Sequence, residues 1–250
     1  MAAETIQKIP RGYIAIDIER TGRTLADITF AFGLAHAPRD AKNITELKKM
    51  HVCLNLKKPS DMSWQEFWIV KGFEQRCWNE FWSKPDITPI LDFLQNPIEV
   101  ILVDTLEEFA RMINDILHEA EECYERSMPV IDCPLFDPVH VGEILTKYGY
   151  MPIQYTRSNR YRSSWEIDSF IAGIGCFYPE DWEPRRNLEE KKMKRFLLAE
   201  KNHNHHPEND AESILLTALA AVSYAKYLKE KRDLKKKEKD NDSPKRQRSE

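Results

Sequence analysis

Runs of apolar residues along the chain predict a series of short strands. The run 13–18 contains strong strand formers and is bounded by Gly12 and Gly22, which is the pattern of a buried central strand. Later runs rich in β-forming residues predict four further strands, over 27–35, 50–56, 99–103 and 128–131. The first three runs follow one another closely and predict an antiparallel meander.

Helical spacing of apolar residues predicts the helices. Thr105-x-x-Glu108 has the form of a capping box and predicts a helix that runs to about Glu125. The clearest apolar stripe lies in 208–228, where small residues would let the helix approach a sheet closely. Weaker patterns predict two more helices, over 139–147 and 188–200. A meander followed by strand, helix, strand and helix predicts an α/β fold, with a mixed sheet flanked by helices.

Aromatic residues are concentrated in 64–82, within a helical insertion predicted over about 60–95. The 64/67/68 and 78/81/82 spacings each place three rings on one helical face. A buried core face requires this periodicity, so core packing is the favoured interpretation. Stacking of nucleic-acid bases on exposed rings is the alternative.

Two acids end the first predicted strand. Because side chains alternate along a strand, Asp17 and Glu19 emerge on the same face. Two carboxylates at the end of a buried strand repel each other unless cations neutralise them, and oxygen ligands of this kind suit Mg²⁺ or Mn²⁺. An Asp-x-Glu pair is common by itself, and a solvated strand end is the simpler explanation when no other acids accompany it.

Two later segments carry many cations. The stretch 155–165 interleaves three arginines with three aromatic residues, a combination suited to phosphates and bases, although an exposed charged loop has the same composition. The tail 229–250 has almost no apolar residues and is predicted to be disordered. Its basic runs fit a nuclear address, a non-specific nucleic-acid arm or a solubilising tail.

Composition narrows the class of protein. The chain has 250 residues, a mass of 29.4 kDa and a formal net charge of -4, so it is not a basic nucleic-acid-coating protein. This length predicts one domain with elaborations, divided as 1–228 for the folded part and 229–250 for the tail. The 5 cysteines form no C-x-x-C pair, which favours reduced thiols inside a cell, in the cytoplasm or nucleus. No apolar run is long enough to predict a membrane span, and the N-terminus lacks a signal-peptide core.

Three acid-bearing segments stand out in the chain: 17–22 with Asp17 and Glu19, 132–137 with Asp137, and 205–211 with His205 and Asp210. Together they resemble the DEDDh group of 3′–5′ exonucleases, which belongs to the DnaQ and RNase T superfamily. The first motif of that group, Asp-x-Glu-(Thr)-Thr-Gly, stands here at 17–22, with Arg20 as the departure. Its second motif, of the form Asn-x-x-Phe-Asp, is matched by 133–137, where Cys133 replaces the usual Asn and Asp132 is a competing acid.

The third motif of the group, His, four residues, Asp and commonly Ala, is matched from His205 to Asp210 and Ala211. A sister group requires Tyr four residues before the last Asp, a position occupied here by His206, so the histidine class fits better. The resemblance covers about 12–228. The forms of the motifs look most like exonucleases of phages and large DNA viruses, a resemblance that implies a viral origin.

The resemblance implies a ribonuclease-H-like fold and a metal-dependent exonuclease. Two Mg²⁺ or Mn²⁺ ions would be held by four acids, Asp17, Glu19, Asp137 and Asp210. His205 would act as the general base, and a nucleoside 5′-monophosphate would leave the 3′ end of DNA or RNA. Further contacts to the nucleic acid are expected from five residues, Arg20, Thr21, Arg157, Arg160 and Tyr161.

Other functions fit parts of the same pattern. A haloacid-dehalogenase-like phosphatase also has acids at a strand end, but it requires a second Asp where Glu19 stands. A cluster of histidines from His203 to His206 is a weak candidate for zinc, because no cysteines lie near it in sequence. A non-catalytic nucleic-acid-binding or scaffolding protein with the same fold remains the main alternative, and a homo-oligomer is compatible with the sequence.

Overall fold

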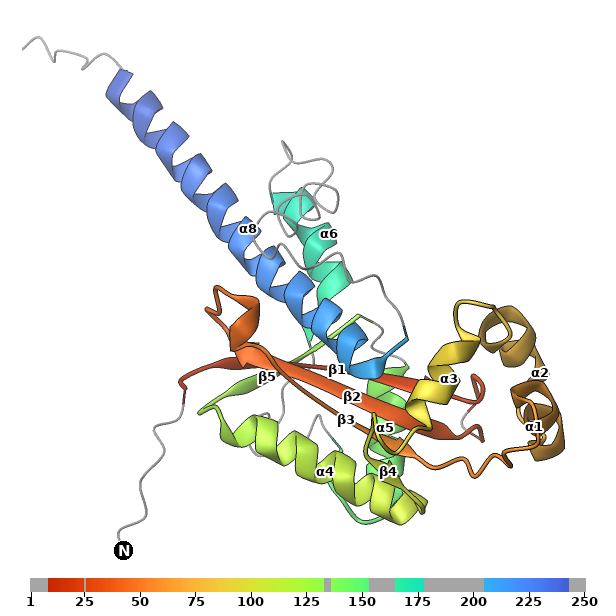
Figure 1. The fold of residues 1–250 in the computed structure, drawn as a ribbon. Helices are drawn as coiled ribbons and strands as arrows, with labels where there is room; N and C mark the ends of the chain where they lie inside the picture. The colour runs from red at the N-terminus through yellow and green to blue at the C-terminus, as the bar shows by residue number, and fades with distance from the viewer. Residues whose placement is uncertain (1–8, 25, 133–135, 153–164, 178–204, 243–250) are drawn as a thin grey trace, which may run out of the picture.

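A mixed sheet forms the centre of the molecule (Figure 1). The computed structural model of the protein describes residues 9–24, 26–132, 136–152, 165–177 and 205–242. Within these residues the sheet has six strands in the order β4-β3-β2-β1-β5-β6. Their bounds are β1 Gly12–Arg20, β2 Thr29–Pro38, β3 Lys48–Leu54, β4 Leu102–Val103, β5 Ser127–Ile131 and β6 Trp165–Glu166.

Strand pairing confirms the predicted α/β class. β1, β2 and β3 pair antiparallel, as the predicted meander requires. β5 pairs parallel with β1, β6 parallel with β5, and β4 parallel with β3. α4 (Leu106–Glu122) connects β4 to β5, which lie on opposite sides of the three meander strands. Thr105 Oγ1 accepts a hydrogen bond from the Glu108 backbone N–H at 3.1 Å, so α4 begins at the predicted cap.

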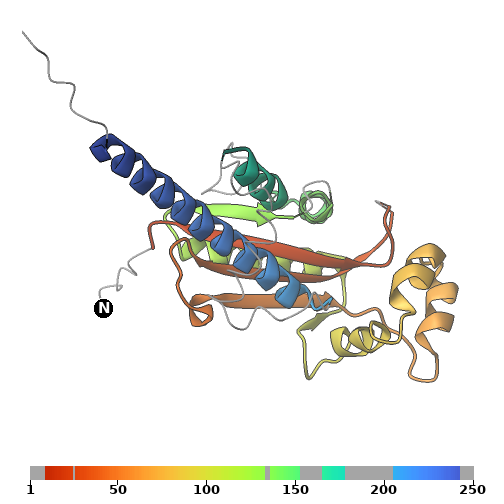
Figure 2. The same ribbon diagram turned by 90° about the horizontal axis from the view of Figure 1, so that it is seen from above.

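Helices cover both faces of the sheet (Figures 1 and 2). One face packs against α8 (Pro207–Asp242) and α6 (Ile167–Phe177), and the other against α4 and α5 (Asp137–Lys147). The sequence did not predict α6, whose apolar residues are interrupted by two glycines.

The alternation along β1 assigns its side chains to the two layers. Ile14 and Ile16 belong to the core beneath α4, whereas Tyr13 and Ala15 pack with α8. Asp17 continues the second series, so its side chain and that of Glu19 lie on the α8 face. Small side chains on both elements permit the close approach of α8 to the sheet, among them Ala15, Ala35, Ala211, Ala218 and Ala221.

The aromatic segment is a compact helical insertion that packs against the far end of the sheet (Figure 1). It contains α1 (Trp64–Lys71), α2 (Gln75–Cys77), the π-helix η2 (Trp78–Trp82) and α3 (Thr88–Leu94). Five of its rings are buried, those of Trp64, Phe67, Trp68, Trp78 and Trp82. These rings therefore pack the core, as their helical spacing favoured, and do not form an exposed stacking platform.

The C-terminal helix differs from the prediction that 229–250 is disordered. α8 continues past Leu228 to Asp242, and every residue of 229–237 is exposed. The extension follows from local terms, because Lys, Glu, Arg and Leu have high helix propensity and Pro244 is the first helix breaker after Leu228. Figure 1 shows this part of α8 projecting away from the sheet.

Three further observations complete the fold. No helix in the described ranges combines the length and apolar character that crossing a bilayer requires. Among the described residues, Cys53, Cys77 and Cys123 are free thiols. The predicted helix 188–200 lies outside the described residues.

Candidate metal centre

Four acids from three elements meet at one end of the sheet. Asp17 and Glu19 lie in the last part of β1, Asp137 opens α5, and Asp210 lies in the first turn of α8. Pro138 follows Asp137 in the first turn of α5, where a residue without an N–H is tolerated. The first turn of a helix also stabilises a carboxylate through the helix dipole, which favours ionised Asp137 and Asp210.

All four carboxyl groups are buried. The relative exposures are 8% for Asp17, 7% for Glu19, 6% for Asp137 and 1% for Asp210. Asp17 Oδ2 has no hydrogen-bond partner among the described residues. A buried carboxylate oxygen without a partner is costly, and a hard divalent cation is the ligand that such an oxygen suits best. The residues present therefore fit a Mg²⁺ or Mn²⁺ site.

Burial and mutual repulsion shift the pKa values of three of these acids upward, those of Asp17, Glu19 and Asp137. Burial, followed by the charges of Glu19, Asp137 and Asp210, raises the pKa of Asp17 well above its usual value. Burial and the charge of Asp210 raise the pKa of Glu19 in the same way. Burial, with the charges of Asp132 and Glu19, raises the pKa of Asp137 to about 8, although Arg20 opposes the shift. In the absence of cations these shifts favour the protonated forms of Asp17, Glu19 and Asp137, and a bound metal would displace those protons.

His205 lies beside these acids in an uncommon backbone conformation. Its φ is 58°, in the left-handed region, where histidine is better tolerated than most residues. Its Nδ1 lies 3.6 Å from Glu19 Oε1, and its backbone N–H donates to Asp210 Oδ2 at 2.9 Å. The ring meets the edge of Phe81 with centroids 4.4 Å apart. Donor atoms of Glu19, His205 and Asp210 all lie within 4.8 Å of one another.

Burial also acts on His205, but in the opposite direction. It lowers the pKa of the imidazole, while the charge of Asp210 raises it. The neutral form therefore predominates at neutral pH, which is the form that can accept a proton.

Gly33 allows the start of α8 to reach the metal centre. It lies directly opposite Asp17 in the β1–β2 ladder. A methyl group at Gly33 would overlap the backbone of Pro207 and Glu208. Because the side chains of directly opposed residues share a face, the missing methyl group leaves room for the first turn of α8 beside Asp17.

Asp132 and Asp137, the two competing acids of the second motif, have different surroundings. Asp132 follows β5 and is exposed, whereas Asp137 is buried at the start of α5. The intervening residues 133–135 lie outside the described part of the chain. Burial beside Glu19 and Asp17 favours Asp137 over Asp132 as a ligand candidate, and the choice between them stays a prediction.

Arg20 does not have the substrate-facing position that the first motif suggested. It is buried, and all five of its N–H groups have partners. Nε donates to Thr29 Oγ1 at 3.0 Å, Nη1 to Gly22 O at 3.3 Å, and Nη2 to Thr24 O at 2.9 Å and Asp27 O at 2.7 Å. The fifth bond joins Nη1 to His140 Nε2 at 2.9 Å. Arg20 therefore braces the loop between β1 and β2.

Thr21 also has a structural position. It is fully buried, and its Oγ1 accepts from the Ile28 backbone N–H at 3.0 Å. The polar groups of Arg20 and Thr21 are used within the fold, which favours a structural role over the predicted contact with substrate. Arg157, Arg160 and Tyr161 lie outside the described residues.

His140 is a residue of this region that the sequence did not single out. Because Arg20 can only donate, His140 Nε2 accepts, so the neutral ring carries its proton on Nδ1, 3.5 Å from Glu143 Oε2. Burial and the Arg20 charge lower the pKa of His140, and this pKa shift keeps the ring an acceptor. The i, i+3 spacing from Asp137 was the sequence signal that placed it beside the second motif.

Comparisons with known proteins identify the fold. No protein-family model matches the chain, and no curated protein matches it in sequence. The zinc-bound form of the complex of E. coli exonuclease I with single-stranded DNA is similar over 89% of this chain and 42% of its own, at 15% identity and a TM-score of 0.51.

Two further structures of E. coli exonuclease I are similar. The complex with a dT13 oligonucleotide matches 85% of this chain and 40% of its own, at 15% identity and a TM-score of 0.45. The complex with a dA16 oligonucleotide matches 87% and 41%, at 11% identity and a TM-score of 0.46. The chain spans about two fifths of the length of the exonuclease I chains that it matches. The chain therefore has a fold similar to that of exonuclease I, an α/β fold with a mixed sheet as its sequence pattern predicted.

Proposed function

We propose that this protein is a metal-dependent 3′–5′ exonuclease that releases nucleoside 5′-monophosphates from a nucleic-acid strand. The observation that carries the proposal is the convergence of four buried carboxyls beside a histidine at one end of β1, where the pKa values of Asp17, Glu19 and Asp137 are raised. Structural ion-pair networks also shift pKa values, but here like charges are gathered, which is typical of a site built for cations.

The four acids would supply the ligands for the cations. Asp17, Glu19, Asp137 and Asp210 would hold two Mg²⁺ or Mn²⁺ ions, which supply Lewis-acid chemistry that activates water and stabilises the leaving 3′ oxygen. Asp17 Oδ2 has no hydrogen-bond partner among the described residues, so it is available as a metal ligand. Asp17 lies opposite Gly33 and beside the α8 turn, so it is the acid best placed to contact cations shared by both elements.

The histidine supplies the proton acceptor. His205 would take the proton from the attacking water as the water oxygen bonds to phosphorus and the bond to the 3′ oxygen breaks. Its left-handed backbone and its N–H bond to Asp210 fix the ring relative to Glu19. A residue held in a sparsely populated conformation at such a site is consistent with a positioned catalytic group.

The nucleic acid is proposed to be a single strand with a free 3′ end. The exonuclease I structure of highest TM-score reported above contains single-stranded DNA, which makes DNA the first substrate to test. Arg157, Arg160 and Tyr161 remain proposed contacts to the strand, because guanidinium and phenol groups suit phosphates and bases. The cysteine content supports a cytoplasmic or nuclear location.

Oligonucleotides labelled at either end test the proposal. With Mg²⁺ or Mn²⁺, a 5′-labelled DNA strand should shorten stepwise to a ladder, and a 3′-labelled strand should release labelled mononucleotide at once. Chelation by EDTA and the Asp17→Asn variant, purified in parallel, should both abolish the products. The rate of cleavage of RNA of the same sequence, compared with that of DNA, measures the preference between ribose and deoxyribose. Strand binding without metal-dependent cleavage would favour the non-catalytic alternative.

A further inference from the structure

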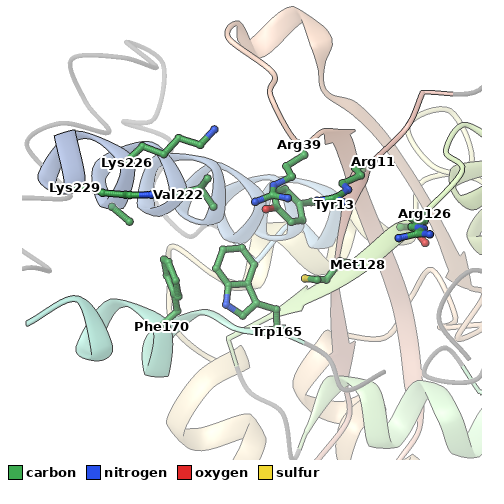
Figure 3. Close-up of a pocket in the computed structure, with 13 residues that line it drawn as sticks. Arg11, Tyr13, Arg39, Arg126, Met128, Trp165, Phe170, Val222, Lys226 and Lys229 are labelled. Carbon is green, nitrogen blue, oxygen red and sulfur yellow. The ribbon is translucent and has the colours of Figure 1, made fainter. Parts of the chain in front are cut away.

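A cavity with basic and aromatic walls lies at the end of β1 opposite the metal centre (Figure 3). Its volume is about 670 Å³, within the range of small-molecule sites. Its side chains come from the ends of β1, β2 and β5, from β6 and α6, and from α8 (Figure 3). No acidic residue is among the described residues that line it.

Three arginines reach the cavity because of the strand register. Arg11 precedes β1, Arg39 follows β2, and Arg126 precedes β5. Gly12 pairs with Pro38 on one side and with Ser127 on the other. The three arginines adjoin these paired residues, so they lie side by side at one end of the strands. Backbone bonds fix them there, from Arg39 N to Arg11 O at 3.1 Å and from Gly12 N to Arg126 O at 2.9 Å. Lys226 and Lys229 of α8 add two further cations.

Aromatic rings form the other wall. Trp165 packs against Tyr13 with centroids 5.4 Å apart and meets Phe170 edge-on at 4.7 Å. Trp165 and Phe170 are only half-buried, so part of each ring faces the cavity. Arg39 and Arg11 lie close enough to the Tyr13 hydroxyl to lower its pKa against the larger rise that burial causes.

We propose that this cavity binds a phosphorylated nucleotide, with its phosphate at the arginines and its base against Trp165. Guanidinium groups match phosphate geometry, and an indole ring is a platform for any base. The nucleotide is either free or one unit of a strand. α8 runs from Asp210 at the metal centre to Lys226 at the cavity, about 24 Å for a helix of this length, so a strand of roughly seven nucleotides would span both sites.

Calorimetric titration in EDTA tests the cavity without hydrolysis. The ligands are deoxyadenosine monophosphate, a single-stranded DNA of about four and one of about twelve nucleotides, inorganic phosphate, and deoxyadenosine. If the ligand is a free nucleotide, the native chain should bind the monophosphate more tightly than inorganic phosphate or deoxyadenosine. If the ligand is one unit of a strand, the native chain should bind the longer strand more tightly than the shorter strand, phosphate or deoxyadenosine. The monophosphate result identifies a free nucleotide, and a length dependence identifies a strand.

Matched variants assign the binding to these residues. Arg39→Gln with Lys226→Gln should weaken binding at least tenfold and flatten its salt dependence, whereas Lys235→Gln with Lys237→Gln, on the exposed part of the same helix, should not. Trp165→Leu should weaken binding at least about fivefold, and Trp165→Tyr should retain most of it. Equal binding of inorganic phosphate, displacement by an acidic peptide as readily as by nucleotide, or no binding of either nucleotide form would overturn the proposal.

Discussion

Gly33 lies opposite Asp17 in the sheet, and the absence of its side chain lets the first turn of α8 enter the metal centre. A methyl group there would overlap the backbone at Pro207 and Glu208, which cannot yield as a flexible side chain can. Asp210 lies three residues after Pro207, so its position depends on Gly33, a residue that has no side-chain functional group.

The variant Gly33→Ala measures this dependence. It should displace the start of α8, destabilise the protein by about 1–3 kcal/mol and weaken Mn²⁺ binding. Gly142→Ala is the control, because a methyl group there would lie 3.6 Å from Pro152 Cβ in ordinary contact, and it should stabilise α5 by about 0.5–1 kcal/mol. Urea unfolding and a Mn²⁺ titration provide both readouts. Native Mn²⁺ affinity in Gly33→Ala would contradict the role given to this position.

Arg20 is expected to act on stability. Arg20→Ala leaves the carbonyls of Gly22, Thr24 and Asp27 without their donor and should cost on the order of 3 kcal/mol. Arg20→Lys should lose most of this energy too, since an ammonium cannot reproduce the five-bond geometry. Arg23→Gln, at an exposed ion pair nearby, should change the free energy of unfolding by less than about 1 kcal/mol. If Arg20→Ala kept native stability but bound a strand more weakly, the result would support a contact between Arg20 and substrate and contradict the structural role.

The raised pKa values give the metal-free protein a defined pH dependence. A carboxyl whose pKa is higher in the folded state binds more protons there, so its stabilising contribution is complete below pH 4 and is lost as pH rises toward its folded pKa. For Asp137 that window extends from about 4 to about 8. Unfolding in EDTA between these pH values should show falling stability in the native chain and a smaller fall in Asp137→Asn. Equal slopes would show that Asp137 is not coupled to the other acids.

The variant His205→Asn distinguishes a role of this histidine in proton transfer from a role in metal binding. His205→Asn keeps a residue that tolerates left-handed backbone, so its stability should be close to native, while turnover should fall by about 10²–10⁴. Burial lowers the histidine pKa, so the acid limb of native turnover at saturating metal should lie below about 6.5. Mn²⁺ titration distinguishes the two roles: retained affinity supports a general base, and lost affinity would show that His205 is a metal ligand.

The sequence predicted those features that local pattern controls. Alternation placed Asp17 and Glu19 on one face, and the Thr105 cap fixed the start of α4. Helical spacing correctly favoured burial of the rings around Trp68. Each of these features depends on neighbours within one element, which a pattern of residues contains.

Features that depend on distant partners were not predictable. Arg20 looked like a substrate contact because its partners at Asp27 and His140 come from a loop and another helix. Gly33 looked like an ordinary strand residue, because its function appears only when α8 is packed on β2. The length of α8 was missed because its exposed extension lacks an apolar stripe, although its residues favour a helix.

The choice between Asp137 and Asp132 tests the account of the metal centre most directly. Mn²⁺ binding and release of mononucleotide from a labelled strand should be measured on Asp137→Asn and Asp132→Asn, which make the same chemical change at a buried and an exposed acid. We predict that Asp137→Asn loses nearly all activity and much of its metal affinity, because it removes a buried ligand beside Asp17 and Glu19. Asp132→Asn should retain most of both. An active Asp137→Asn together with an inactive Asp132→Asn would contradict the assignment.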